Sequence, residues 1–239
     1  MYKYEITKRI EDFAPLETQE DWDCSGWAVN IDGYDEIGKV MLCLTVTKDI
    51  IRQAKEQNCD MIVSHHPCFY IPLEWSFINI YCAHTNMDKA KGGTTDTVID
   101  KLGLSGYKTE IEHHFLRVLD YKTTLNDFSK LIKQIFPNAR LINPHPNPLP
   151  KDEGDILFLH KIAFCAGAGS DLINDAKELG ADCFVTGDLK FHRALESPII
   201  IYDIGHFESE ILILPIFEKN IGNDVKIVYA DEHSPFEMI

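Results

Sequence analysis

The chain has 239 residues, a length that fits one large domain or two closely associated lobes. Hydrophobic residues make up 45% and charged residues 26%, which is ordinary for a globular protein and excludes a collagen, a coiled coil or a wholly disordered chain. The formal net charge of −15 disfavours broad attraction to phosphate backbones, so direct nucleic-acid binding is not expected.

Helix-like and strand-like patterns alternate along the chain. In the first half they predict a helix over 4–14 that ends before Pro15, a strand over 39–46, a helix over 48–57, strands over 60–64 and 78–83, and a helix over 94–103. In the second half they predict a helix over 124–136, a strand over 160–166, a helix over 170–179, strands over 182–186 and 199–203, a helix from about 208, and a strand over 225–229. This alternation predicts an α/β fold with mixed sheets.

Residues 143–154 contain four prolines, which fit neither a helix interior nor a sheet ladder. We expect a surface loop there, with a solvated His145. The seven cysteines form no C-x-x-C pair, which is typical of reduced thiols in a cytosolic protein. The N-terminus lacks the apolar core of a signal peptide, and no run approaches the roughly 18 apolar residues of a membrane helix. A cytoplasmic protein without membrane contact is therefore expected.

The first candidate functional motif is Ser64-His65-His66-Pro67, directly after a predicted buried strand. The ends of strands in an α/β sheet present side chains to a crevice. Adjacent side chains on an extended backbone point to opposite faces, so His65 and His66 suit two different metal ions better than one. Polar loop residues without a ligand remain the alternative.

The second motif is His84-Thr85-Asn86-Met87-Asp88, which also follows an apolar strand and precedes a glycine pair and Asp96. Imidazole and carboxylate together suit Zn, Mn or Fe. His84 fits either a ligand or an outer partner that orients one. Asp88 and Asp96 fit helix caps as well as metal ligands.

The third motif, Asp203 to Glu210, follows another strand. His206 and Glu210 are four residues apart, so on a helix they share one face and can serve one centre. A capped helix N-terminus, with Ser209 or Asp203 as the cap, is the alternative. Taken together, imidazoles and carboxylates without cysteine indicate a hydrolytic or Lewis-acid centre, and two ions at roughly 3.5–4 Å can clamp a phosphate or carbonyl oxygen.

These motifs resemble the Nif-three-like dinuclear-metal family, also called GTP cyclohydrolase I type 2 homologues, over almost the whole chain. Six stretches carry the resemblance in order: Asp21-Trp22-Asp23-Cys24-Ser25-Gly26, Ser64-His65-His66-Pro67, His84-Thr85-Asn86-Met87-Asp88, Phe164-Cys165-Ala166-Gly167-Ala168-Gly169-Ser170, Thr186-Gly187-Asp188-Leu189-Lys190-Phe191-His192 and Gly205-His206-Phe207-Glu208-Ser209-Glu210. The resemblance implies two interlocked α/β lobes within a single domain over 1–239, without the inserted domain of longer members. It also implies ring-shaped homohexamers.

The resemblance further implies two divalent metal ions, of which the sequence identifies neither. The matching ligands are His65 and Asp88 on one ion, His66 and His206 on the other, and Glu210 bridging them. His84 matches a neighbouring histidine that fits the second shell of ligands better than the first.

Three positions depart from the family pattern. Thr45 stands where the family usually has aspartate, and Cys24 where it usually has asparagine. His113-His114-Phe115-Leu116-Arg117 replaces a glycine-containing turn, so the family's substrate does not carry over automatically. His113 and His114 fit surface histidines or polar contacts of a cavity.

Two further stretches have open interpretations. Asp188 and His192 fit a polar wall near a substrate or a helix cap with a satisfied histidine. The turn Ala166-Gly167-Ala168-Gly169-Ser170 fits either a phosphate held by backbone amides or a packing role.

The function expected is a dinuclear metal-dependent hydrolase of a nucleotide-like small molecule, either GTP cyclohydrolase-like or a phosphodiesterase. Glu208, His84 or Asp96 would move protons, and no sequence feature chooses among them. The alternative is a non-catalytic metal-binding ring that engages protein partners.

Overall fold

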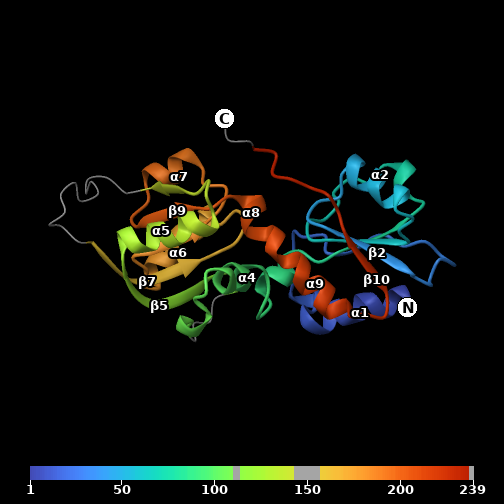
Figure 1. Ribbon diagram of the computed structural model, residues 1–239, viewed down its shortest axis with the longest axis horizontal. Helices are drawn as coiled ribbons and strands as arrows, with labels where there is room; N and C mark the ends of the chain where they lie inside the picture. Colours follow the sequence, from blue (N-terminus) through green and yellow to red (C-terminus); the bar gives the residue numbers. More distant parts are fainter. Residues whose placement is uncertain (110–113, 143–156, 237–239) are drawn as a thin grey trace. The chain divides into compact units, whose positions relative to one another are not determined.

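The computed structural model describes residues 1–109, 114–142 and 157–236. Two compact units are present: Met1–Gly93 with Ile211–Pro235 form unit 1, and Thr94–Glu210 form the main part of unit 2 (Figure 1). The expected loop over 143–154, its His145, and His113 lie outside the described residues.

The sheet of unit 1 has the strand order β1-β4-β3-β2-β10. Its strands are β1 (Gly26–Val29), β2 (Lys39–Cys43), β3 (Met61–Ser64), β4 (Asn79–Cys82) and β10 (Lys226–Tyr229). Strands β10, β2, β3 and β4 run parallel, and β1 pairs antiparallel with β4. The carboxyl ends of four neighbouring strands therefore meet at one edge of this sheet.

Helices cover both faces of this sheet. They are α1 (Lys3–Phe13), α2 (Lys48–Glu56), α3 (Thr85–Lys89) and α9 (Leu214–Ile221), with short 3-10 turns at Leu16–Thr18, Leu73–Trp75 and Ile211–Ile213. Helix α9 contacts both α1 and β2, whereas α2 lies on the other side of the sheet (Figure 1). Thr47 caps α2 by accepting a hydrogen bond from the backbone N–H of Ile50, which explains why this helix begins where the sequence predicts.

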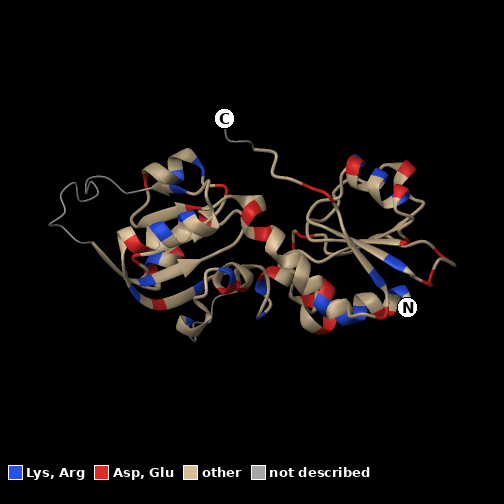
Figure 2. Cartoon of the chain, viewed as in Figure 1, with Lys and Arg blue, Asp and Glu red and all other residues tan. Residues whose placement is uncertain are grey.

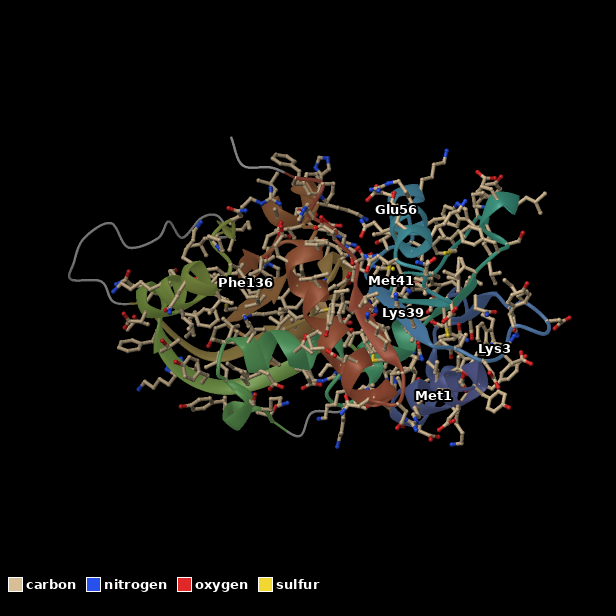
Figure 3. The ribbon with its side chains drawn as sticks, turned by 45° about the vertical axis from the view of Figure 1, so that its right-hand side comes forward. Met1, Lys3, Lys39, Met41, Glu56 and Phe136 are labelled. Atoms are coloured by element: carbon tan, nitrogen blue, oxygen red, sulfur yellow. The ribbon has the colours of Figure 1, made fainter. Side chains whose placement is uncertain are left out.

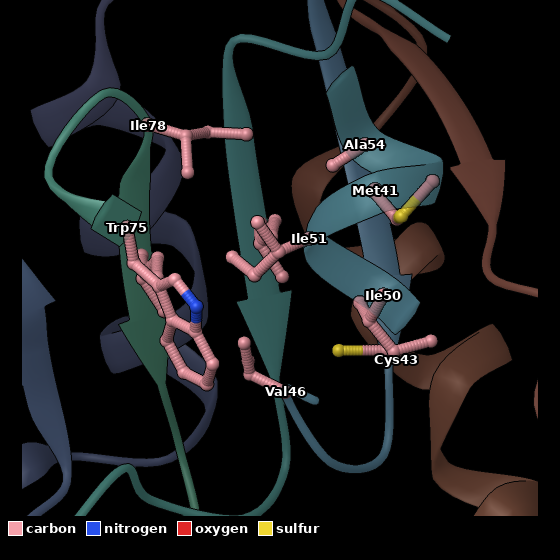
Figure 4. Close-up of a cluster of buried hydrophobic side chains, with 10 residues drawn as sticks. Met41, Cys43, Val46, Ile50, Ile51, Ala54, Trp75 and Ile78 are labelled. Carbon is pink, nitrogen blue, oxygen red and sulfur yellow. The ribbon is translucent and has the colours of Figure 1, made fainter. Parts of the chain in front are cut away.

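The core between α2 and the sheet contains the alternate residues Met41 and Cys43 of β2 together with side chains of α2, β3 and β4. Its labelled members in Figure 4 are Met41, Cys43, Val46, Ile50, Ile51, Ala54, Trp75 and Ile78. Figure 3 shows Lys39 and Met41 along β2 and Glu56 at the end of α2. Lys3 of α1 is fully buried, and its Nζ binds the carbonyl of Ile31 at 2.6 Å and Asp35 at 2.8 Å, so this charge is paired.

The sheet of unit 2 has the strand order β5-β7-β8-β9-β6. Its strands are β5 (Arg117–Thr124), β6 (Arg140–Ile142), β7 (Phe158–Phe164), β8 (Cys183–Thr186) and β9 (Ile200–Asp203). Strands β7, β8 and β9 are parallel, and the edge strands β5 and β6 are antiparallel to their neighbours. Both sheets are thus mixed, which confirms the predicted α/β fold class.

Unit 2 also carries helices on both faces of its sheet. They are α4 (Thr94–Lys101), α5 (Leu125–Ile135), α6 (Ile173–Glu178), α7 (Phe191–Leu195) and α8 (His206–Glu210), with 3-10 turns at Ser105–Tyr107 and Ser170–Leu172. Ile201 of β9 belongs to the core cluster that includes Ile173 and Ala176 of α6. The ring of its neighbour Tyr202 packs edge to face on that of Phe128 of α5, with 5.3 Å between the ring centroids. Because adjacent side chains of a strand point to opposite faces, α5 and α6 pack on opposite faces of the sheet.

Acidic side chains are distributed over both units, and basic side chains lie among them (Figure 2). On α2, for example, Arg52 binds both Asp49 and Glu56. Burial raises the pKa of the core thiols Cys43 and Cys183, which keeps them protonated. In the described part of the chain, no helix has the length and apolar character that a membrane span requires.

Candidate metal centre

Three histidines of unit 1 gather at the carboxyl ends of two adjacent strands. His65 and His66 directly follow β3, and His84 follows β4 after one residue. Ser64 at the end of β3 pairs in register with Cys82 at the end of β4, so the residues after both strands are neighbours. We call His65, His66 and His84 the triple-histidine cluster.

One ring nitrogen from each member of this cluster lies within 4.8 Å of the others, close enough to serve one metal ion or adjacent ions. The ring centroids of His65 and His66 are 5.2 Å apart, and Oδ1 of Asp88 lies 3.5 Å from Nε2 of His65. The expectation that adjacent histidines point to opposite faces is wrong, because β3 ends at Ser64 and the chain bends at His65 and His66. The alternation of an extended strand no longer applies there.

The first two histidines of the cluster each bind an oxygen through Nδ1. In His65, Nδ1 lies 3.0 Å from the carbonyl oxygen of Ala83. A carbonyl only accepts, so Nδ1 carries the hydrogen and Nε2 has the lone pair that a metal needs. In His66, Nδ1 lies 2.6 Å from the hydroxyl of Thr45, which can donate as well as accept, so this contact holds Nδ1 without fixing the tautomer.

Asp23 orients the third histidine. Its Oδ1 accepts from Nδ1 of His84 at 3.0 Å, and its Oδ2 accepts from the backbone N–H and the hydroxyl of Thr85 at 3.0 and 2.6 Å. Burial raises the pKa of Asp23, but the hydrogen bonds from Thr85 and His84 outweigh burial and hold that pKa well below its usual range. Asp23 therefore stays an anion. Sequence reasoning placed it in a motif but gave it no role.

His206 and Glu210 form the second candidate group, the α8 pair. The predicted shared helix face is confirmed, because both residues lie on α8 with Nε2 of His206 2.8 Å from Oε2 of Glu210. Nδ1 of His206 lies 2.8 Å from Oδ2 of Asp188. Burial lowers the pKa of His206, but the carboxylates of Glu210 and Asp188 outweigh burial and raise it to about 9.

Asp188 follows strand β8 and adopts an unusual backbone conformation, with φ of 50°. Non-glycine residues in this left-handed region are uncommon and concentrate at functional sites. The carboxylate binds His206, whereas His192, its predicted neighbour in a polar wall, is exposed on α7. Asp188 therefore binds His206, which follows the next strand of the sheet, rather than His192, which is four residues along the chain.

The glycine-rich turn before α6 supports the α8 pair by close packing. A Cβ atom on Gly167 would lie 1.9 Å from Oε1 of Glu210. The backbone N–H of Gly167 donates to Ser209 Oγ at 2.9 Å, and that of Gly169 donates to Thr186 Oγ1 at 3.0 Å. Because these amides already bind hydroxyls, the structure favours the packing interpretation over phosphate binding.

The three predicted proton carriers lie in different surroundings. His84 belongs to the triple-histidine cluster. The carboxylate of Glu208 folds back over Gly205, where an added Cβ would lie 2.1 Å from its Oε2. Asp96 is buried and binds Nζ of Lys108 at 2.7 Å and Nε of Arg117 at 3.0 Å. Asp96 thus holds together α4, the following turn and β5, which is a structural role.

The residues that depart from the family pattern also lie in different parts of the structure. Cys24 is exposed beside Asp23, and its backbone N–H donates to that carboxylate at 2.7 Å. Arg117 of the altered turn donates to the carbonyl of His114 at 3.2 Å. Thr45 contacts a candidate ligand directly, as its hydroxyl lies 2.6 Å from Nδ1 of His66.

The donor set fits divalent metal ions. Four imidazoles have an oxygen on Nδ1, which is the usual arrangement of metal-binding histidines. Carboxylates of Asp88 and Glu210 lie beside two of them. Nitrogen and oxygen ligands of this kind suit Zn, Mn or Fe.

The chain is therefore an α/β protein with two mixed sheets that carry histidines and carboxylates at their strand ends. Residues 1–235 match the family model described as Duf34/NIF3 (NGG1p interacting factor 3), and the chain belongs to this family. A Clostridium perfringens protein named "GTP cyclohydrolase 1 type 2 homolog" is 32% identical, with 98% of each chain covered. A Campylobacter jejuni protein of the same name is 27% identical, again with 98% of each chain covered.

Solved structures agree with this assignment. The reduced HcgD of Methanocaldococcus jannaschii has a TM-score of 0.80 and 26% identity, covering 97% of this chain and 98% of that one. The Bacillus cereus protein related to NIF3 has a TM-score of 0.81 at 19% identity, covering 100% and 99% of the two chains, and this second likeness shows the fold alone.

Proposed function

We propose that this protein is a hydrolase that uses two divalent metal ions to act on a nucleotide-like small molecule. The observation that carries the proposal is the common orientation of His65, His66, His84 and His206, each of which binds an oxygen through Nδ1. Imidazoles held by an oxygen on Nδ1, with carboxylates beside two of them, are the usual arrangement of metal-binding histidines.

In this proposal, the metal ligands come from the three motifs that follow strands β3, β4 and β9. His65 and Asp88, whose Nε2 and Oδ1 atoms lie 3.5 Å apart, would hold one ion, and His66 and His206 would hold the other. Glu210 would be a ligand to both ions. The ions are Zn, Mn or Fe, because nitrogen and carboxylate ligands serve all three.

Bound divalent ions supply Lewis-acid activation of water and of a substrate phosphate or carbonyl oxygen. The chain's own residues position the ligands: Asp23 holds His84, Asp188 holds His206, and the carbonyl of Ala83 holds His65. His84 is our first choice for moving a proton, since Asp23 fixes its ring and leaves Nε2 free to exchange one. Glu208 is the second choice, and the ion pairs of Asp96 make it the weakest of the three.

The name shared by the curated relatives, GTP cyclohydrolase 1 type 2 homolog, supports a substrate related to GTP. Phosphodiester hydrolysis suits the same ligands. The net charge of −15 supports a small molecule rather than nucleic acid as the binding partner. We further propose that the protein works in the cytoplasm as a ring-shaped homohexamer.

The test loads the protein with Zn²⁺ or Mn²⁺, measures bound metal, and assays hydrolysis of GTP and of a model phosphodiester. The variants H65A and E210Q should lose roughly 100-fold or more in activity, since even an outer partner of a metal ligand is worth about 10–100-fold. The matched control is H192A, which removes an exposed histidine on α7 and should change activity less than about twofold. A protein that binds two ions but turns over neither substrate contradicts the hydrolase, and activity retained by H65A contradicts the ligand assignment.

A second candidate function is a metal-binding scaffold for protein partners. It is favoured by exposed apolar side chains in one stretch of unit 1, where Phe69, Tyr70 and Leu73 are 74%, 78% and 85% exposed. The family description, NGG1p interacting factor 3, supports the same idea. Partner capture that survives H65A and E210Q but fails with F69S/L73S would favour the scaffold over the hydrolase.

A further inference from the structure

The segment after β10 is fixed against the carboxyl end of β2. The backbone N–H of Ala230 donates to the carbonyl of Leu42 at 2.9 Å. The amide of Gln53, a buried residue on α2, donates to the carbonyl of Asp231 and accepts from its N–H, both at 2.8 Å. Residues more than 170 positions apart in the chain therefore meet here, and the segment has a defined course.

The next residue of this segment, Glu232, places its carboxylate at the end of β2. Its Oε1 accepts from the backbone N–H of Leu44 at 2.5 Å, and its Oε2 accepts from that of Thr45 at 3.4 Å. Burial raises the pKa of Glu232, whereas these two amides and the neighbouring His66 act in the opposite direction. The carboxylate is thus a partly buried acid beside a candidate metal ligand.

His66 differs from the other candidate ligands in the group that holds its Nδ1. Three imidazoles bind an acceptor that cannot donate, namely a carbonyl or a carboxylate: His65 on Ala83, His84 on Asp23 and His206 on Asp188. His66 binds the hydroxyl of Thr45, which is neutral and can donate as well as accept. Thr45 alone therefore fixes neither the tautomer nor the charge around this ligand.

We propose that Glu232 is the positioning carboxylate for His66, supplying from the C-terminal segment the negative charge that a neutral Thr45 cannot supply. The carboxylate holds the backbone of Thr45 in place, so that its hydroxyl meets Nδ1, and its charge favours a cation on Nε2 of His66. The C-terminal segment is thereby part of the metal site. This inference rests on the proposed function.

The chain offers a specific way to test this role, because positions 45 and 232 lie side by side. A carboxylate at either position would serve His66, whereas carboxylates at both would repel each other. E232Q should lower the affinity for one ion about 10-fold, the lower end of the usual loss for an outer partner. T45D/E232Q should regain most of that affinity, whereas T45D alone should not exceed the wild type.

The measurement is a competition titration with Co²⁺ and with Zn²⁺, followed by the visible spectrum of the Co²⁺ protein, which reports ligand geometry without any substrate. Glutamine keeps one oxygen to accept from Leu44, and unfolding by urea will verify that E232Q stays folded. The control is D231N, which changes the adjacent, 82% exposed carboxylate and should leave both affinities unchanged.

Wild-type affinity in E232Q, or a double variant that binds no tighter than E232Q, would overturn the inference while leaving the metal centre intact. A wild-type protein that binds neither Co²⁺ nor Zn²⁺ would instead remove the proposed function itself. The two failures are therefore distinguishable in one set of titrations.

Discussion

Asp23 is the most heavily bonded side chain of the candidate site, and its loss has a predictable cost. Its carboxylate is fully buried and accepts five hydrogen bonds, from Cys24 N–H, Ser25 Oγ, His84 Nδ1, and the N–H and Oγ1 of Thr85. The substitution D23N keeps the size of the side chain but replaces one acceptor oxygen with an NH₂ group.

The magnitude follows from how the bonds divide between the two oxygens. Oδ1 receives bonds from two N–H groups, and Oδ2 from one N–H and two hydroxyls, which can turn to accept; either orientation of an asparagine therefore brings its NH₂ group against at least one N–H that cannot accept. With about 1.5–2 kcal/mol for each hydrogen bond to a charged acceptor, D23N should destabilise unit 1 by at least about 1.5–2 kcal/mol. For a protein of this size that lowers the Tm by roughly 3–8 °C.

Tryptophan fluorescence is the appropriate assay, because all three tryptophans, Trp22, Trp27 and Trp75, lie in unit 1. Urea unfolding followed by this signal isolates unit 1, and the matched control is D21N, at an exposed aspartate of the same segment. Because the pKa of Asp23 is lower in the folded protein, its stabilisation is present above the ordinary aspartate pKa of about 3.9 and is lost as the pH falls further. The difference in unfolding free energy between the wild type and D23N should therefore become smaller only below about pH 4. A loss under 1 kcal/mol, or one equal to that of D21N, would refute this reasoning.

Two other predictions concern the α8 pair. The pKa of His206 is about 9 in the folded protein, above the unfolded value, so its stabilisation of the metal-free protein is fully present below about pH 6.5 and lost as the pH rises through 9. At pH 7.5 a metal that binds Nε2 of His206 must displace a proton. Calorimetric titration with metal in phosphate and in Tris, two buffers with different ionisation enthalpies, should show that the wild type releases about one more proton on metal binding than H206A does. Gly167 has φ of 65° and no room for a Cβ against Glu210. G167A should therefore lower unit 2 stability by more than about 1 kcal/mol and weaken metal binding, whereas A168G, its control, should leave metal affinity unchanged.

The sequence was sufficient for the central strands and failed at the edges of the sheets. Strands β3, β4, β8 and β9 are buried along their whole length and therefore appear as continuous apolar runs. The edge strands β1, β5 and β6 were not predicted, because their residues are largely half-buried or exposed. Edge strand β10 is the exception, since Ile227, Val228 and Tyr229 have high β-propensity.

Differences in element length also have local causes. The strand predicted over 39–46 ends at Cys43, because the amides of Leu44 and Thr45 bind the carboxylate of Glu232 instead of continuing a ladder. The helix predicted over 170–179 begins as a 3-10 turn and becomes α6 only at Ile173. The short helices α3 and α7 were missed, since each has only five residues and too little periodicity to detect.

The candidate site shows the same difference between features set by neighbouring residues and features set by residues distant in the sequence. The candidate ligands were predictable from local features, because a strand end precedes His65 and His84 and a one-turn spacing joins His206 to Glu210. Their partners were not: Asp23 lies 61 residues from His84, Thr45 lies 21 from His66, and Glu232 lies 188 from Leu44. Only the fold brings these residues together.

Residue type would not have identified these partners either. The oxygen on Nδ1 comes from a backbone carbonyl, a hydroxyl or a carboxylate, depending on the histidine. What orients an imidazole is the position of an acceptor, and several chemical groups can occupy that position. A neutral residue at position 45 is therefore tolerable where a charge arrives from another segment. Substitutions at such positions are best judged together with the residues that the fold places beside them.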